Sequence, residues 1–88
     1  MKRLEVELLT DGGNDAVVRL PGRQFPGVLV QGDSLSIVRA DVSELVGLCD
    51  AGDLEGAKET AALLLADMDA LIRRYTEALR LHGIQLPF

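Results

Sequence analysis

If this chain used a serine nucleophile, Ser34 and His82 would be the candidate nucleophile and general base. Ser34 follows Gly32 and Asp33, and a serine nucleophile needs a general base within hydrogen-bond reach that is itself oriented by a third group. His82 is the only histidine, and it ends a long helical run directly before Gly83. A histidine at that position is better explained as a cation beside the negative end of a helix dipole. We therefore predict that the chain is not an enzyme and has no catalytic residues.

The same segment allows a second interpretation, an anion site at a helix start. Glycine followed by capping residues exposes backbone N–H groups at the positive end of the helix dipole. Arg19, Arg23 or Arg39 would supply the countercharge, but the carboxylate of Asp33 would lie where the anion binds. We expect Asp33 or Ser34 to cap the helix instead. The alternative function is a small-ligand or anion-binding protein, or an enzyme, that uses the helix start at Asp33–Ser34 with Arg19 and Arg23.

No metal or cofactor site is predicted. Asp67 and Asp69 are two residues apart on a predicted helix, so their carboxylates point to different sides. Cys49 is the only cysteine, which excludes an internal disulfide and a cysteine-based zinc cluster. Its place on the apolar face of a helix predicts a buried structural thiol.

The segment Arg23-Gln24-Phe25 lies between two Pro-Gly pairs that predict turns. A constrained loop loses little conformational entropy on binding, and arginine and aromatic residues are enriched at interface hot spots. We predict that Arg23, Gln24 and Phe25 bind a protein partner. In the alternative, Phe25 folds inward and completes the core, and the sequence favours neither position.

The sequence pattern predicts the elements that position these residues: an α+β fold of order βββαα within one domain, residues 1–88. Apolar residues alternate with charged ones up to residue 8, the polar segment 10–15 is a loop, and residues 16–20 form the second strand of an antiparallel hairpin. Residues 28–30 follow as a short, mostly buried strand. The side chains of the first two strands expected to face the core are Leu4, Val6, Leu8, Ala16, Val18 and Leu20.

Two helices complete the prediction. The first covers residues 34–50, and the corner Ala51–Gly52 forces it into an antiparallel hairpin with a second helix over residues 53–81. Asp53 is the expected N-cap and Gly83 the expected C-cap of the second helix. At 1.5 Å per residue the helices are about 25 Å and about 42 Å long, so the second projects past the first.

The projecting end of the second helix predicts self-association. Exposing its apolar side chains would be unfavourable, so either the sheet or a second copy of the chain must cover them. We predict a homodimer, because a chain this small has little core of its own. The apolar C-terminal segment 84–88 is expected to dock. The residues predicted for self-association are Leu71, Ile72, Tyr75 and Leu79.

Charge and composition exclude several classes of partner. The net charge is −5 and hydrophobic residues make up 48% of the chain, with three aromatics in all. Residues 41–88 carry the whole acidic excess, which argues against binding to a nucleic-acid backbone. No apolar run approaches the roughly 18 residues of a membrane span, and carboxylates occupy the place of a signal-peptide apolar segment. We expect a cytoplasmic protein without nucleic-acid or membrane partners.

The run Ala16–Arg23, continued from Phe25 to Leu35, resembles a small bacterial protein family of unknown function. Tyr75, the sequence His82-Gly83-Ile84 and the ending Leu86-Pro87-Phe88 are similar too. The resemblance implies a stand-alone bacterial cytoplasmic domain and brings no activity with it. From the residues we predict a non-catalytic interaction or regulatory module. An immunity- or inhibitor-type protein that binds a basic toxin would share this profile.

Overall fold

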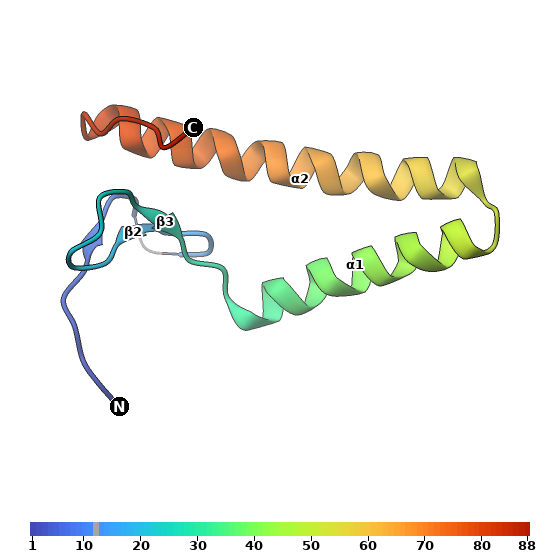
Figure 1. The fold of residues 1–88 in the computed structure, drawn as a ribbon, viewed down its shortest axis with the longest axis horizontal. Coiled ribbons are helices and arrows are strands. Elements are labelled where there is room, and N and C mark those ends of the chain that lie inside the picture. The colour runs from blue at the N-terminus through green and yellow to red at the C-terminus, as the bar shows by residue number, and fades with distance from the viewer. Residues whose placement is uncertain (12) are drawn as a thin grey trace. The chain divides into compact units, whose positions relative to one another are not determined.

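The computed structural model describes residues 1–11 and 13–88, and it has three short strands followed by two helices (Figure 1). The predicted α+β order βββαα, with the longer helix second, is confirmed. Gly12, part of the predicted loop 10–15, lies outside the described residues. The elements are β1 (Glu7–Leu8), β2 (Val17–Arg19), β3 (Gly27–Val28), α1 (Gly32–Asp50) and α2 (Leu54–Leu81).

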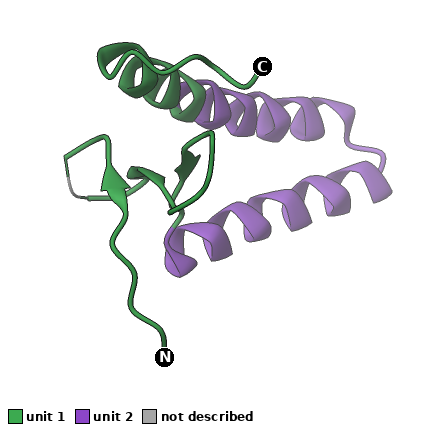
Figure 2. Cartoon of the chain, turned by 60° about the vertical axis from the view of Figure 1, so that its left-hand side comes forward, with its two compact units in different colours: residues 1–30, 71–88 green, residues 31–70 purple. Residues whose placement is uncertain are grey.

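The chain divides into two compact units, coloured separately in Figure 2. Unit 1 comprises residues 1–30 and 71–88, which are the sheet, the end of α2 and the C-terminal segment. Unit 2 comprises residues 31–70, which are α1 and the first part of α2.

The sheet of unit 1 is antiparallel, in the order β1-β2-β3. Glu7 lies opposite Arg19, and Val17 lies opposite Val28. The N–H of Leu9 donates to the carbonyl of Val17 at 2.9 Å, so pairing continues just past β1.

The prediction of which side chains of the first two strands face the core is wrong by one residue along the chain. Leu9 is buried and Leu8 is exposed, while Val17 is fully buried and Val18 only half-buried. Successive side chains of a strand point to opposite faces, so burial of Leu9 turns Leu8 outward. Because Leu8–Leu9 and Val17–Val18 are both apolar pairs, the alternation did not determine the face. The side chains predicted to be inside but found exposed are Leu4, Val6, Leu8, Leu20, Leu29 and Val30.

The hydrophobic core of unit 1 lies between the sheet and the last turns of α2. Leu9 and Val17 of the sheet pack with Tyr75, Ala78 and Leu79 of the helix. The C-terminal segment docks as predicted, because Ile84 and Leu86 pack against this core. Phe88 stacks on Tyr75 with ring centroids 6.2 Å apart.

Both ends of α2 form as predicted. Asp53 is the N-cap, since its Oδ1 accepts the N–H of Gly56 at 2.9 Å. At the other end the N–H of Ile84 donates to the carbonyl of Leu79 at 2.9 Å, and Gly83 takes a φ of 66°. This 6→1 bond with a left-handed glycine is the Schellman motif.

The start of α1 differs from the prediction. The helix begins at Gly32, and its N-cap is Gln31, which makes no side-chain capping hydrogen bond. Asp33 and Ser34 therefore lie inside the first turn instead of capping it. An N-cap preference indicates where a helix is able to start, but it did not locate the start here.

Unit 2 is a hairpin of α1 and the first part of α2 (Figure 2). None of the 19 residues of α1 is buried, and in α2 only Ala57 and Leu64 are buried within this unit. Cys49 is exposed, so the prediction of a buried thiol is wrong for the single chain. No helix in the described part of the chain is long and apolar enough to cross a membrane.

Candidate functional site

The loop that presents Arg23, Gln24 and Phe25 begins with the predicted turn. The N–H of Arg23 donates to the carbonyl of Leu20 at 3.2 Å, and Gly22 has a φ of 76°. That conformation suits glycine because it has no Cβ. The second Pro-Gly pair does not make a turn of its own, since Gly27 is the first residue of β3. All three presented residues are exposed, with Phe25 at 38%.

Tyr75 fastens this loop to α2. Its hydroxyl donates to the carbonyl of Pro26 at 2.8 Å, and both residues are buried. Burial raises the pKa of the Tyr75 hydroxyl, because the phenolate would lose its hydration. The residue next to the presented Phe25 is thus fixed, which limits the conformations that the loop can adopt.

Arg19 supports the same loop from the sheet. Its guanidinium binds the carboxylate of Glu7 through two hydrogen bonds, Nε–Oε1 at 3.0 Å and Nη2–Oε2 at 2.8 Å. Its Nη1 also donates to the carbonyl of Gln24 at 3.4 Å. The hydrogen bonds from Arg19 lower the pKa of Glu7. The guanidinium of Arg19 therefore already binds Glu7 and the carbonyl of Gln24, which disfavours Arg19 as the countercharge of a bound anion.

Three side chains, two in α2 and one directly after it, donate hydrogen bonds to backbone carbonyls and were missed in the sequence. Arg74 and His82 do this as well as Tyr75. A carbonyl only accepts, so Nε2 of His82 must carry a proton and cannot serve as a general base in this arrangement. No sequence signal marks such contacts, because every residue has a carbonyl. The bonds are Arg74 Nε to Asp15 O at 3.1 Å, Tyr75 Oη to Pro26 O at 2.8 Å, and His82 Nε2 to Leu9 O at 2.9 Å.

The alternative anion site at Asp33–Ser34 gains little from the structure. The N–H of Ser34 donates to Oδ1 of Asp33 at 2.9 Å, so a carboxylate already occupies one of the free donors. Asp33 and Ser34 belong to unit 2, whereas Arg19 and Arg23 belong to unit 1.

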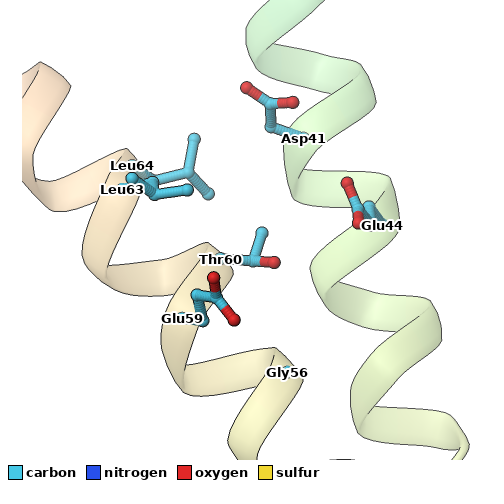
Figure 3. Close-up of a pocket in the computed structure, with 7 residues that line it drawn as sticks. All are labelled: Asp41, Glu44, Gly56, Glu59, Thr60, Leu63 and Leu64. Carbon is cyan, nitrogen blue, oxygen red and sulfur yellow. The ribbon is translucent and has the colours of Figure 1, made fainter.

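A cavity of about 320 Å³ lies within unit 2 (Figure 3). Asp41 and Glu44 of α1 and Glu59 of α2 give it an acidic lining, which is unfavourable for an anionic ligand. No cluster of three metal-ligating side chains occurs among the described residues. The sequence did not reveal this cavity, because its residues come from two separate helices and mix polar with apolar side chains. The lining is Asp41, Glu44, Gly56, Glu59, Thr60, Leu63 and Leu64.

The residues predicted for self-association are divided by the structure. Tyr75 and Leu79 belong to the core of unit 1, so their own sheet and C-terminal segment cover them. Leu71 is half-buried, and Ile72 is exposed. Within this set, Ile72 is thus the side chain most available to a partner, and self-association itself stays a prediction.

Comparison with known proteins gives one match. No curated protein and no solved structure matches the chain. The resemblance to a family of unknown function, drawn from the central run and the C-terminal ending, is confirmed over the full length. The chain, through residues 1–88, belongs to the family of unknown function DUF6959.

Proposed function

We propose that this protein is a non-catalytic interaction module that acts as a homodimer and presents a loop to a protein partner. The observation that carries the proposal is α1, a helix of 19 residues with no buried side chain. A helix gains most of its stability in a protein by packing an apolar face. An apolar helix with so little cover is expected to find it in another molecule.

The balance of exposed and buried apolar side chains supports this. Twenty large hydrophobic side chains of the described residues are at least 37% exposed, whereas eight hydrophobic residues are buried. Isolated exposed apolar residues are normal, but contiguous ones indicate an interaction surface. A chain of 88 residues also forms only a small hydrophobic core. Burial of apolar side chains between two copies would therefore add stability that folding of one chain alone does not supply.

The loop of Arg23, Gln24 and Phe25 supports a second, protein-binding role. It is exposed, yet Arg19 donates to the carbonyl of Gln24 and Tyr75 donates to the carbonyl of the adjacent Pro26. Preorganisation of this kind reduces the entropy lost on binding. The test is a pull-down with the native protein. A partner retained by the wild type and by Gln85→Ala, but lost with Phe25→Ala, supports the loop, and equal retention by Phe25→Ala refutes it.

Absence of catalysis is part of the proposal. The one histidine uses Nε2 to donate to Leu9, and Arg19 is held by Glu7. A fluorophosphonate probe is expected not to label the pure protein, and stoichiometric labelling that disappears in Ser34→Ala would refute the proposal. We also propose a cytoplasmic location, since a single exposed thiol suits a reducing compartment.

Sedimentation equilibrium of the wild-type protein at micromolar concentration tests the dimer. A mass twice that of the chain is expected. A monomer mass over the whole accessible range would refute self-association and leave the loop as the remaining interaction surface.

A further inference from the structure

The helical hairpin of unit 2 leaves an apolar row uncovered on α1. Asp41 and the half-buried Leu45 and Leu48 mark the side of α1 that faces α2, since Asp41 lines the cavity shared with that helix. At about 100° per residue, the row lies about a quarter-turn from that side. Its spacing of three and four residues is that of a helix-packing seam. The row is Leu35, Val38, Val42, Val46 and Cys49, all exposed.

The first part of α2 carries a matching row. Ala57 and Leu64 are its buried positions, and Thr60 and Leu64 line the shared cavity, so they mark the side toward α1. A second row again lies about a quarter-turn away, in the same rotational sense with increasing residue number. The row is Leu54, Ala61, Leu65 and Met68, all exposed.

Both rows lie on one face of the hairpin. The two helices run in opposite directions (Figure 1), and equal rotations in the same sense then bring the rows to the same side of the pair. Glu44 and Glu59, which line the cavity, are rotated to the opposite side of the pair from the two rows, so these acidic side chains and the apolar surface are separated. The row on α1 includes no charged residue, and the charged residue nearest the row on α2 is Lys58, one turn after Leu54.

From this geometry we infer that the two rows form the dimer interface, and that two hairpins pack face to face as an antiparallel four-helix bundle. This inference rests on the proposed homodimer and names its surface, which differs from the predicted projecting end of α2. A hairpin with two apolar seams on one face is half of such a bundle. A twofold axis covers both seams of both copies at once.

The exposed area fits a second copy of the chain. The large side chains of the two rows, Cys49 and Ala61 left aside, are 37–80% exposed. Covering them would remove on the order of 600 Å² per chain, so a dimer would bury about 1,200 Å², the lower end of the range for specific interfaces. Polar residues Ser36, Arg39, Ser43 and Asp50 border the row on α1 and would form the rim of the interface.

The small core of unit 2 favours a second copy of the chain as the partner. Unit 2 has only two buried side chains of its own, so its stability needs a partner that is present whenever the chain folds. Another copy of the same chain meets that condition.

The test compares two matched variants of α1 by sedimentation equilibrium. Val42, 42% exposed, is central in the row, whereas Ile37, 63% exposed, lies on another side of the same helix. Val42→Asp is expected to raise the dimer dissociation constant at least about 100-fold, because each copy would bury an unpaired carboxylate. Ile37→Asp is expected to change it by less than about threefold, since exposed positions tolerate a charge.

Cys49 provides a second measurement that needs no variant. It lies in the row on α1 and is exposed in the single chain, so dimerisation should shield it from Ellman's reagent. The reaction is expected to slow at least about tenfold above the dimer dissociation constant and to recover on dilution, because a buried thiol is inert. If Val42→Asp fails to fold, as far-ultraviolet circular dichroism would show, this measurement decides alone.

The outcomes separate the two proposals. A wild-type monomer would refute the homodimer and this interface together. A wild-type dimer that persists in Val42→Asp, or whose Cys49 reacts equally fast in dimer and monomer, would leave the homodimer standing and refute this surface. A dimer disrupted equally by Ile37→Asp would also refute it.

Discussion

Substitution of Tyr75 by phenylalanine isolates the hydrogen bond that fastens the Arg23–Phe25 loop to α2. Tyr75→Phe keeps the ring, and with it the packing on Leu79 and the stacking on Phe88. It removes only the hydroxyl, which donates to the carbonyl of Pro26 at 2.8 Å. Any effect on stability therefore reports on the bond and on the acceptor left behind.

The structure sets the size of the effect. Tyr75 is 6% exposed and Pro26 is buried, so water does not readily replace the lost donor. Leaving a buried polar group without its partner costs about 1–3 kcal/mol. We expect a loss of about 1–2 kcal/mol, since a small shift of the loop would admit water to the carbonyl. For a chain of this length the melting temperature should fall by about 4–8 °C per kcal/mol.

Urea denaturation at one fixed protein concentration measures this loss, because the stability of a dimer depends on concentration. A pH series adds a second readout. The raised pKa of Tyr75 means that the folded state keeps the phenol proton to higher pH than the unfolded state, so wild-type stability should fall as pH rises above about 10. Tyr75 is the only tyrosine, and Tyr75→Phe should lack that part of the decline. Equal stability of both proteins at neutral pH, with parallel decline in alkali, would refute the reasoning.

Three further predictions concern the sheet and the helix ends. The lowered pKa of Glu7 means that its pairing with Arg19 stabilises the fold above the ordinary glutamate pKa of about 4.3 and is lost as pH falls below it. An acid titration followed by circular dichroism should therefore show a steeper loss for the wild type than for Glu7→Gln, and parallel curves would contradict the pairing. Gly83→Ala should lower the free energy of unfolding by about 1 kcal/mol, because φ is 66° there while no atom lies within 4 Å of an added Cβ; urea denaturation measures it, and an unchanged midpoint would show that the helix end adjusts without strain. Asp53→Ala should lose about 0.5–2 kcal/mol in the same assay through the missing cap on Gly56, with Asp53→Asn losing less; if the two variants proved equal, the carboxylate oxygen would not be the stabilising group.

The elements themselves followed from local signals in the sequence. The three-and-four spacing over residues 54–81, the capping aspartate at 53 and the left-handed glycine at 83 each act within one or two turns of helix, and all three were predicted correctly. The βββαα order followed similarly from alternation, turn residues and the short corner at residues 51–52. The start of α1 was placed two residues late, because Asp33 and Ser34 resemble caps while the backbone turns at Gln31.

The candidate binding surfaces depended on more than these local signals. Arg23, Gln24 and Phe25 are exposed, whereas the next residue, Pro26, is buried and accepts a hydrogen bond from Tyr75, 49 residues away in sequence. The burial of Tyr75 and Leu79 likewise follows from which face the first strand turns inward. A stripe of apolar residues shows that a helix has a side to cover, but not which element covers it.

The sequence by itself determined the type and order of the elements and the approximate length of the two helices, because propensity, periodicity and capping act between residues close in the chain. Only the tertiary structure decided which of two adjacent apolar residues faces the core, at Leu8–Leu9 and at Val17–Val18. Only the tertiary structure showed that the side chains of Arg74, Tyr75 and His82 bind backbone carbonyls, and that α1 has no buried residue. The physical reason is that burial and carbonyl contacts are made between distant segments, and their free energies depend on the packed arrangement rather than on the identity of either residue alone.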